Sequence, residues 1–178
     1  LEVEKKALEF GMTLKDSSAY NIQFLNGRPI LIDTLSFQRY SGGEPWVGYR
    51  QFCQHFLAPL ALMSYRHIGM GQLSRLHIDG IPLDMAHSLL PWRTHLKPSL
   101  QMHIHMHAWF QRRFANGRDT KVGGRRPFKL RSFLGLIDSI ESAISKLKWH
   151  PRGTEWVDYY EVDSYTPKAL DHKSGLVT

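Results

Sequence analysis

Hydrophobic residues recur every three or four positions in three long segments of the chain, which is the spacing of amphipathic helices. These segments cover 46–63, about 99–114 and 130–147. We expect Pro59 to kink the first of them, because a proline inside a helix removes a backbone hydrogen bond. Shorter helices are predicted over 1–10, over 83–90 and after Pro167.

A second pattern, with apolar residues at every second position, covers 20–25 and 29–33 and is typical of strands. Between them stands Asn26-Gly27, a pair strongly preferred in two-residue β-hairpin turns. The apolar residues of the alternation are Ile22, Phe24, Ile30 and Ile32. We therefore expect one buried face on the hairpin. The predicted fold class is mainly α (α+β), a helical domain with one small β-hairpin.

Length and composition support this interpretation. The chain has 178 residues, of which 42% are hydrophobic and 22% charged, so it suits one domain with a sizeable core. We expect a helical domain over 1–150 and an aromatic tail over 151–178. The apolar run 56–63 is too short to span a membrane, and the N-terminus lacks the apolar region of a secretory signal. With only one cysteine, which excludes a disulfide scaffold, these features predict a cytoplasmic protein with no membrane partner.

The net charge of +7 comes from one segment. Between Arg112 and Arg131 there are eight basic residues and one acidic residue, and the rest of the chain carries 15 of each sign. Such a segment is typical of phosphate or polyanion binding. The residues predicted to make these contacts are Lys15, Arg112, Arg113, Arg125 and Arg126. A solvated loop, or one that packs on an acidic neighbouring domain, is the alternative.

Three oxygen-bearing side chains lie around the ends of the predicted hairpin. Asp16 precedes Asn21 by five residues, and Asn21 precedes Asp33 by twelve. In kinase-type phosphotransferases an aspartate accepts the proton of the substrate hydroxyl, an asparagine five residues later binds a metal ion, and an aspartate after a hairpin holds Mg²⁺. This spacing predicts Asp16 as catalytic base and Asn21 with Asp33 as Mg²⁺ ligands. Ordinary turn chemistry, with the aspartates as caps, is the alternative.

The segment NIQFLNGRPILID, within 14–37, resembles the catalytic loop of aminoglycoside and choline phosphotransferases. The resemblance implies a fold like the C-terminal lobe of a kinase and a small-molecule phosphotransferase that uses Mg-nucleotide. Two features depart from that family. Leu14-Lys15 stands where the family has His-Gly or His-Arg, and Thr34-Leu35 replaces the usual aromatic residue or glycine. The thirteen residues before Leu14 contain no Gly-rich loop, so the nucleotide-clamping lobe is not in this sequence.

Four longer stretches carry a second resemblance. They are LKDSSAYNIQFLNGRPILIDTLSF, PWVGYRQFCQHFLAPLALMSY, DGIPLDMAHSLLP and EWVDYYEVDSYTPKAL. Together they resemble the N-terminal region of bacterial class I S-adenosylmethionine-dependent methyltransferases of the nodulation type. The resemblance implies a methyltransferase parent that uses S-adenosylmethionine, with its C-terminal methyltransferase domain as the partner of this region. This chain would then be an accessory or substrate-recognition region, and we expect a fragment because it begins without Met.

The isolated glycine pairs of this chain, Gly42-Gly43 and Gly123-Gly124, do not form the Gly-rich loop that binds a methyl donor. We therefore expect the S-adenosylmethionine site to lie elsewhere in the parent. Whether this chain is itself an enzyme is left open by the sequence. A non-catalytic module that binds polyanions remains the other alternative.

The segment HIHMH, 103–107, is a possible metal site. His103 and His107 are one helical turn apart and can share Zn²⁺, while His105 is expected to point away. The alternative places the pair on the inner stripe, bonded to the backbone or to a carboxylate. For Cys53 we expect a small buried hydrophobe, and a catalytic thiol is the alternative.

Overall fold

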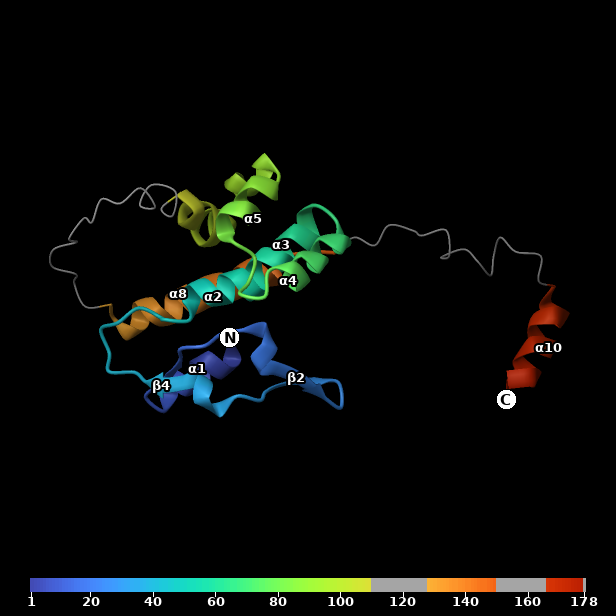
Figure 1. Cartoon of the computed structure of the whole chain (residues 1–178), viewed down its shortest axis with the longest axis horizontal. Coiled ribbons are helices and arrows are strands. Elements are labelled where there is room, and N and C mark those ends of the chain that lie inside the picture. The colour runs from blue at the N-terminus through green and yellow to red at the C-terminus, as the bar shows by residue number, and fades with distance from the viewer. Residues whose placement is uncertain (110–127, 150–165, 178) are drawn as a thin grey trace.

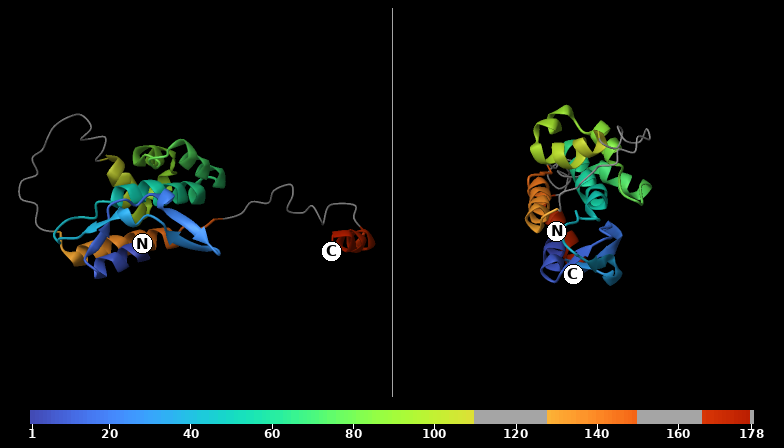
Figure 2. Two further views of the ribbon diagram at one scale, coloured as in Figure 1. Left: turned by 60° about the horizontal axis from the view of Figure 1, so that its bottom comes forward. Right: turned by 90° about the vertical axis from the view of Figure 1, so that its left-hand side faces the viewer.

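The computed structural model describes residues 1–109, 128–149 and 166–177, and it shows a mainly helical protein with two small two-stranded sheets (Figure 1). The predicted helical character is confirmed. The prediction of a single hairpin was incomplete, because a second pair of strands joins segments that are far apart in sequence. The helices and strands form three layers, with the strands and the first helix on one side of the long central helices (Figure 2).

The N-terminal layer contains one helix and four short strands. Helix α1 covers Glu2–Glu9, and the chain turns at Gly11, whose positive φ of 65° fits the predicted stop. Strand β1 (Met12–Leu14) pairs antiparallel with β4 (Phe37–Arg39), and β2 (Ile22–Leu25) pairs antiparallel with β3 (Arg28–Leu31). Asn26 and Gly27 have φ values of 51° and 75°, so both take the left-handed conformation that a type I′ turn requires.

The hairpin β2–β3 is more exposed than its pattern predicts. Phe24 is 73% exposed, Ile32 53% and Ile30 39%, while Ile22 is half-buried. The expectation of a buried face is therefore wrong for the chain as described. The register pairs Ile22 with Leu31 and Gln23 with Ile30, so Ile22 and Phe24 lie on one face of the hairpin and Ile30 and Ile32 on the other.

The central layer is a long helix with a π-helical turn. It consists of α2 (Tyr49–Phe52), the π turn η3 (Cys53–Leu57) and α3 (Ala58–Tyr65). Pro59 lies in the first turn of α3, directly after the π turn, where its missing N–H is tolerated. The irregularity expected at Pro59 therefore takes the form of a widened turn. Cys53, Leu57, Ala58, Ala61 and Leu62 are fully buried.

The third layer covers the other side of this helix. It is built from η4 (Ile68–Gln72), α4 (Leu73–Leu76), α5 (Leu83–Leu89), η5 (Trp92–Leu96), α6 (Pro98–Leu100) and the π turn η6 (Gln101–His105). Ile81, Leu83, Ala86 and Ile104 complete one core cluster with α3. The predicted helix over 83–90 is confirmed. The helix predicted over 99–114 is seen from residue 98 to residue 109, and its remainder lies outside the described residues.

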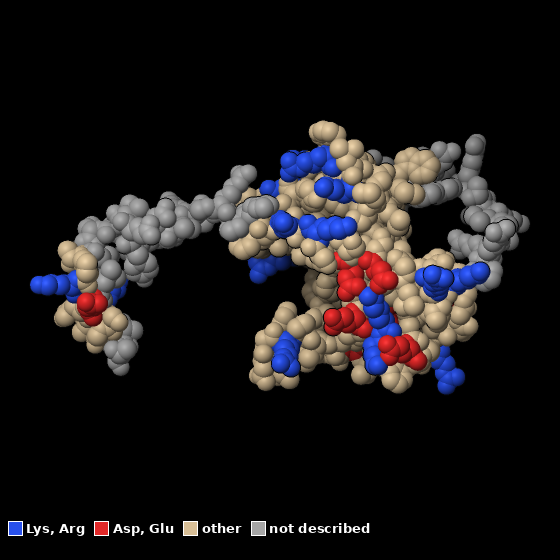
Figure 3. All heavy atoms as spheres, turned by 180° about the vertical axis from the view of Figure 1, so that it is seen from behind, with Lys and Arg blue, Asp and Glu red and all other residues tan. Residues whose placement is uncertain are grey.

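Helix α8 (Leu130–Ser145) confirms the clearest helical pattern of the sequence. Its buried residues Phe133, Ile137 and Ile140 form a second core cluster with Trp46 and Phe52. Lys5 of α1 binds both Asp138 (2.8 Å) and Glu141 (2.6 Å) of α8. Acidic and basic side chains accordingly lie interleaved on one face of the molecule (Figure 3).

The rest of the sequence is described only in part. Helix α10 (Pro167–Val177) confirms the helix expected after Pro167. Most of the basic segment, and most of the aromatic tail over 151–178, lie outside the described residues, and the proposed boundary at residue 150 is untested. Across the described parts of the chain, no helix has both the length and the apolar character needed to cross a membrane.

Candidate metal and phosphate site

The β1–β4 pair brings the two halves of the predicted site together. Asp16 follows β1, and Asp33 precedes η2 (Thr34–Ser36) and β4. The backbone N–H groups of Lys15 (2.9 Å) and Asp16 (3.4 Å) both donate to the Ser36 carbonyl. The loop that carries Asp16 is therefore held against the loop that follows Asp33.

Asn21 and Asp33 are linked through the hydroxyl group of Ser36. The Asn21 side-chain amide donates to Ser36 Oγ (2.9 Å), and Ser36 Oγ donates to Asp33 Oδ2 (2.8 Å). Ser36 is only 1% exposed. Asn21 stands at the start of β2 and Asp33 two residues after the end of β3, so the hairpin carries both residues back to one place.

Turn chemistry is present at the same residues. Asp16 Oδ1 accepts from the Ser18 N–H (3.1 Å), and Asp33 Oδ1 accepts from the Leu35 N–H (2.9 Å). Asp33 thereby caps the 3₁₀ turn η2. Each carboxylate oxygen has two lone pairs, so these caps leave both side chains able to bind a cation. The structure therefore agrees with the turn interpretation and is compatible with the metal interpretation.

The basic residues assigned to phosphate binding are only partly described. Lys15 is exposed and directly precedes Asp16. Arg112, Arg113, Arg125 and Arg126 lie outside the described residues, so their predicted role stays a prediction. Lys129 and Arg131, at the end of the same segment, are both exposed.

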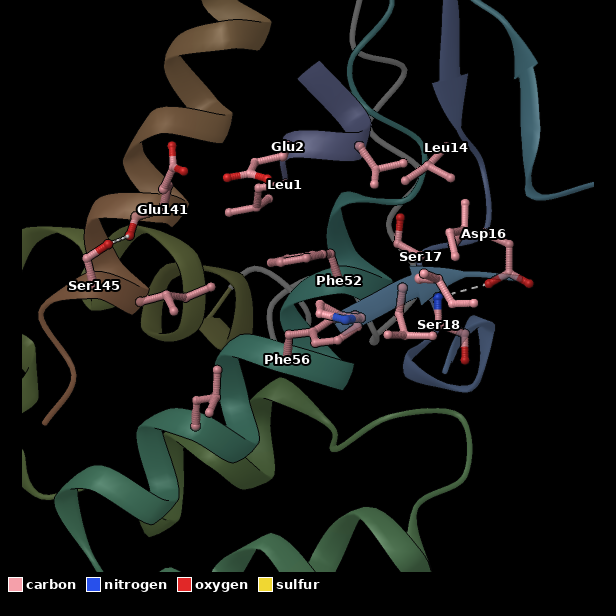
Figure 4. A pocket seen from close by; sticks show the side chains of 17 residues that line it. Leu1, Glu2, Leu14, Asp16, Ser17, Ser18, Phe52, Phe56, Glu141 and Ser145 are labelled. Atoms are coloured by element: carbon pink, nitrogen blue, oxygen red, sulfur yellow. Dashed lines mark hydrogen bonds between the residues drawn. The ribbon is translucent and has the colours of Figure 1, made fainter. Parts of the chain in front are cut away.

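A cavity of about 490 Å³ opens between the hairpin and the helices. Its wall is mostly apolar, and Figure 4 shows Glu141 and Ser145 at one side of it and Asp16 and Ser18 at the other. Figure 3 shows the surface hollowed beside the protruding hairpin. The lining side chains are those of Leu1, Glu2, Val3, Leu14, Asp16, Ser17, Ser18, Ile22, Pro29, Ile30, Leu31, Phe52, Phe56, Leu60, Glu141, Ile144 and Ser145.

A second hollow, of about 500 Å³, reaches Asp16 as well. It is lined by Asp16, Ser18, Tyr20, Gln51, His55, Ile78 and Asp79. Burial lowers the pKa of His55, and the nearby carboxylates of Asp16 and Asp79 oppose that shift. Asp16 thus borders two hollows, one apolar and one with several polar groups.

The chain on either side of Asp16 is held in place by buried and partly buried polar contacts. Trp46 Nε1 donates to the Leu14 carbonyl (2.8 Å), and the Ser17 N–H donates to Gln51 Oε1 (2.6 Å). Glu4, which is fully buried, accepts from Thr13 Oγ1 (2.6 Å) and from the Leu14 N–H (2.8 Å). Burial raises the pKa of Glu4, although both hydrogen bonds oppose the shift.

Sequence reasoning missed the role of Glu4. The signal was its spacing, because Glu4 lies three and four positions before Ala7 and Leu8 on the buried side of α1. An acidic residue on an apolar stripe indicates a buried partner.

His103 and His107 lie on the inner side of their helix, as the alternative to a metal site predicted, and the partners of His103 are hydroxyl groups instead of the backbone or a carboxylate. His103 is fully buried; its Nδ1 lies 2.7 Å from the Tyr49 hydroxyl and its Nε2 lies 2.9 Å from Ser139 Oγ. Burial, together with His107, lowers the pKa of His103 to about 4. Among the described residues, His103 and His107 do not belong to any group of three metal-ligating side chains.

His105 points away from the His103 and His107 pair, as expected: it contacts His87 and Thr94, whereas the pair contacts Tyr49. The sequence did not predict that His105 would be buried there, with only 2% of it exposed. Cys53, in contrast, is the buried hydrophobe that we expected: it is fully buried, and burial raises the pKa of its thiol to about 12.

Comparison with known proteins gives one informative relative. The chain is 32% identical over 180 aligned positions to the nodulation protein NoeA of Rhizobium meliloti (strain 1021). The alignment covers 99% of this chain and 38% of that protein. No protein-family model matches the sequence, and no solved structure matches the fold. This chain is therefore related to part of a NoeA-like nodulation protein, and it spans well under half of that relative's length.

Proposed function

We propose that this chain is the part of a NoeA-like protein that binds a Mg²⁺-bound phosphate group, with Asp16, Asn21 and Asp33 around it. The observation that carries the proposal is the set of hydrogen bonds at Ser36. Its side-chain hydroxyl joins Asn21 to Asp33, and its backbone carbonyl accepts from the loop that carries Asp16. A buried hydroxyl that is hydrogen-bonded to two polar side chains restricts both of them to one orientation.

The donor set fits the ion. Asn21 uses its amide nitrogen toward Ser36, so its carbonyl oxygen is the atom available to a cation. Asp33 adds a carboxylate, and Mg²⁺ takes one or two protein carboxylates and completes its shell with phosphate oxygens and water. When bound, Mg²⁺ would neutralise charge on the phosphate group. Asp16, on the rim of the polar hollow, would accept the proton of a substrate hydroxyl entering from that side.

The order of the elements supports a kinase-like arrangement. A strand (β1), Asp16, Asn21, a hairpin (β2–β3), Asp33 and a strand (β4) follow one another, and the outer two strands pair. The pairing brings the backbone of Asp16 to the backbone of Ser36, three residues after Asp33, although 17 positions separate Asp16 from Asp33; Asn21 and Asp33 do not line the two hollows that Asp16 borders. On this account the site is a kinase-like lobe whose nucleotide-binding partner is supplied from outside the chain.

The role within the parent follows from the resemblance to nodulation-type methyltransferases. We propose that this chain is an accessory or substrate-recognition region, and that S-adenosylmethionine binds a separate C-terminal domain. The exposed apolar side chains of the hairpin are the surface that the rest of the parent would cover, because exposed apolar patches of this kind mark interaction sites. Hydrogen exchange tests this contact: amides of β2 and β3 should exchange more slowly in the full parent than in residues 1–178. Equal exchange rates would refute it.

Binding of Mg²⁺ with inorganic tripolyphosphate, measured by calorimetry, tests the phosphate site. We expect Asp33→Asn to weaken binding by at least about tenfold, because the amide keeps the cap on Leu35 but loses the charge. Asp171→Asn, at an exposed position on α10, is the matched control and should bind like the wild type. Equal binding by Asp33→Asn and the wild type would overturn the proposal.

The second candidate function is polyanion binding by the basic segment. It is favoured by the eight basic residues against one acidic residue between Arg112 and Arg131. Binding through these residues would not need Mg²⁺ and would fall steeply as salt is added. The same calorimetry, repeated with chelator and at two salt concentrations, separates the two functions.

A further inference from the structure

Three histidines from three different elements of the third layer converge at one point. His87 lies on α5, His95 on η5 and His105 on η6, and one ring nitrogen from each lies within 4.8 Å of the others. His87 Nδ1 and His105 Nδ1 are 2.8 Å apart, and the His95 ring stacks on the His105 ring with 3.8 Å between centroids. This cluster is distinct from the His103 and His107 pair, which faces Tyr49.

Thr94 fixes which nitrogen of His105 carries the proton. Thr94 Oγ1 donates its only hydrogen to the Pro91 carbonyl (2.7 Å), so it must accept from His105 Nε2–H, which lies 2.9 Å away. This assignment from the hydrogen-bond network leaves the lone pair of His105 on Nδ1, the atom that faces His87. Burial, with His95 and His87, also lowers the pKa of His105 to about 4, which keeps the ring neutral at pH 7.

We propose that His87, His95 and His105 bind a divalent transition metal of the Zn²⁺ type, with Thr94 as a positioning residue. Neutral imidazoles suit zinc, copper, nickel and cobalt, whereas Mg²⁺ and Ca²⁺ prefer oxygen ligands. A metal-bound histidine whose other nitrogen donates to a fixed oxygen is the usual arrangement of such sites. Here that oxygen is Thr94 Oγ1, which is itself held by the Pro91 carbonyl.

Binding needs only a local adjustment. Two nitrogens on one tetrahedral Zn²⁺ lie about 3.3 Å apart, so His87 and His105 must separate by about half an ångström. The His95 ring must turn out of its stack, because a metal lies in the plane of each imidazole that binds it. His95 is exposed, and to turn it has to give up the contact of its Nδ1 with Gln101 Oε1 (3.2 Å), whereas His105 is buried and stays fixed. Water would fill the fourth position.

The test is Co²⁺ absorption spectroscopy and competition by Zn²⁺, on chelator-treated protein of residues 1–178. We expect one metal per chain and a tetrahedral Co²⁺ spectrum that Zn²⁺ abolishes. His95→Gln should remove this spectrum, and it should leave the metal-free stability unchanged because His95 is exposed. Thr94→Val, which keeps the shape but not the hydrogen bond, should weaken Zn²⁺ binding by about ten- to a hundredfold.

Two controls make the test specific to this cluster. His172→Gln, at an exposed position of α10, and His107→Gln, in the neighbouring histidine pair, should both bind Zn²⁺ like the wild type. Loss of binding in His107→Gln, or unchanged binding in His95→Gln, would overturn the proposal by placing the metal elsewhere. The absence of any Zn²⁺ binding by the wild type would also overturn it and would leave the cluster as a stack of hydrogen-bonded rings.

Discussion

Asn21 and Asp33, which stand near the two ends of the hairpin β2–β3, are joined through a single hydroxyl group. Ser36 Oγ lies 2.9 Å from the Asn21 amide nitrogen and 2.8 Å from Asp33 Oδ2. The two side chains that the sequence predicted as metal ligands therefore share one buried partner. Several measurable consequences follow from this contact and from the buried groups around it.

Ser36→Ala should lower the free energy of unfolding by about 1–3 kcal/mol, because the Asn21 amide loses its acceptor and Asp33 loses a donor. Urea denaturation measures this change. Ser145→Ala is the matched control: its hydroxyl donates only to the Glu141 carbonyl on the exposed surface of α8, so a change within about 0.5 kcal/mol is expected. Equal effects of the two substitutions would show that the bridge contributes nothing specific.

Gly48→Ala should destabilise the loop that supports Asp16. An added Cβ would lie 2.4 Å from Ser17 Oγ and 2.8 Å from the Leu14 carbonyl, so both segments would have to move, at a cost of about 1–3 kcal/mol. Gly135→Ala is the control, since its Cβ would meet nothing within 4 Å. Because Gly135 is in the interior of α8, alanine there should stabilise the protein by about 0.5–1 kcal/mol. Thermal unfolding of both variants tests the contrast, and destabilisation by both would contradict it.

The stability of the fold should fall as the pH drops from 6.5 toward 4. The pKa of His103 is lowered from 6.5 to about 4 in the folded core. Between these values the ring takes up a proton in the unfolded state but stays neutral in the folded state, so its contribution is complete above pH 6.5 and is lost as the pH falls. The loss amounts to at most about 3 kcal/mol. Urea denaturation across this range, with chelator present, measures it.

Glu4 opposes this trend in the lower part of the range. Its pKa is raised by burial, so its protonation favours the folded state as the pH falls. His103→Gln should therefore make the decline in stability shallower, while His105, whose pKa is also lowered to about 4, keeps part of it. An unchanged decline in that variant would show that His103 is not the group responsible.

Cys53 should be inert to thiol reagents in the folded protein. The side chain is fully buried, and burial raises the pKa of its thiol to about 12. At pH 8 the reagent therefore cannot reach the sulfur, and the sulfur is not in the reactive thiolate form. Reaction with an aromatic disulfide reagent should proceed only as fast as the protein unfolds. Rapid stoichiometric labelling without denaturant would contradict the buried hydrophobic role.

Local patterns predicted the elements that depend on local physics. The spacing of apolar residues over 130–147 predicted α8, and the pair Asn26-Gly27 predicted the hairpin turn. Both structures are determined by residues that are close together in the sequence. The β1–β4 pair was missed because three-residue strands separated by more than twenty positions have no period to detect. The burial of His105 was missed for a related reason: the elements that cover that side of its helix, α5 and η5, are separate in sequence and leave no signature in the residue pattern.

The candidate site shows the same division. The prediction of Asp16, Asn21 and Asp33 came from spacing alone and stays a prediction, whereas Ser36 gave no signal because its contacts come from the fold of η2. The three histidines of the cluster are far apart in the sequence: His105 lies within HIHMH, and His87 and His95 are isolated residues. Only the packing of α5, η5 and η6 brings those three rings together.

Paramagnetic broadening by Mn²⁺, which takes the same oxygen ligands as Mg²⁺, tests the central claim most directly. Mn²⁺ is added in small amounts to ¹⁵N-labelled protein, and the amide signals are followed by NMR. We predict that the signals of Asn21, Asp33 and Ser36 broaden first, and that Asp33→Asn abolishes this effect while its spectrum otherwise stays that of the folded protein. Broadening that spares these three amides, or that persists unchanged in Asp33→Asn, would contradict a metal site at the mouth of the hairpin.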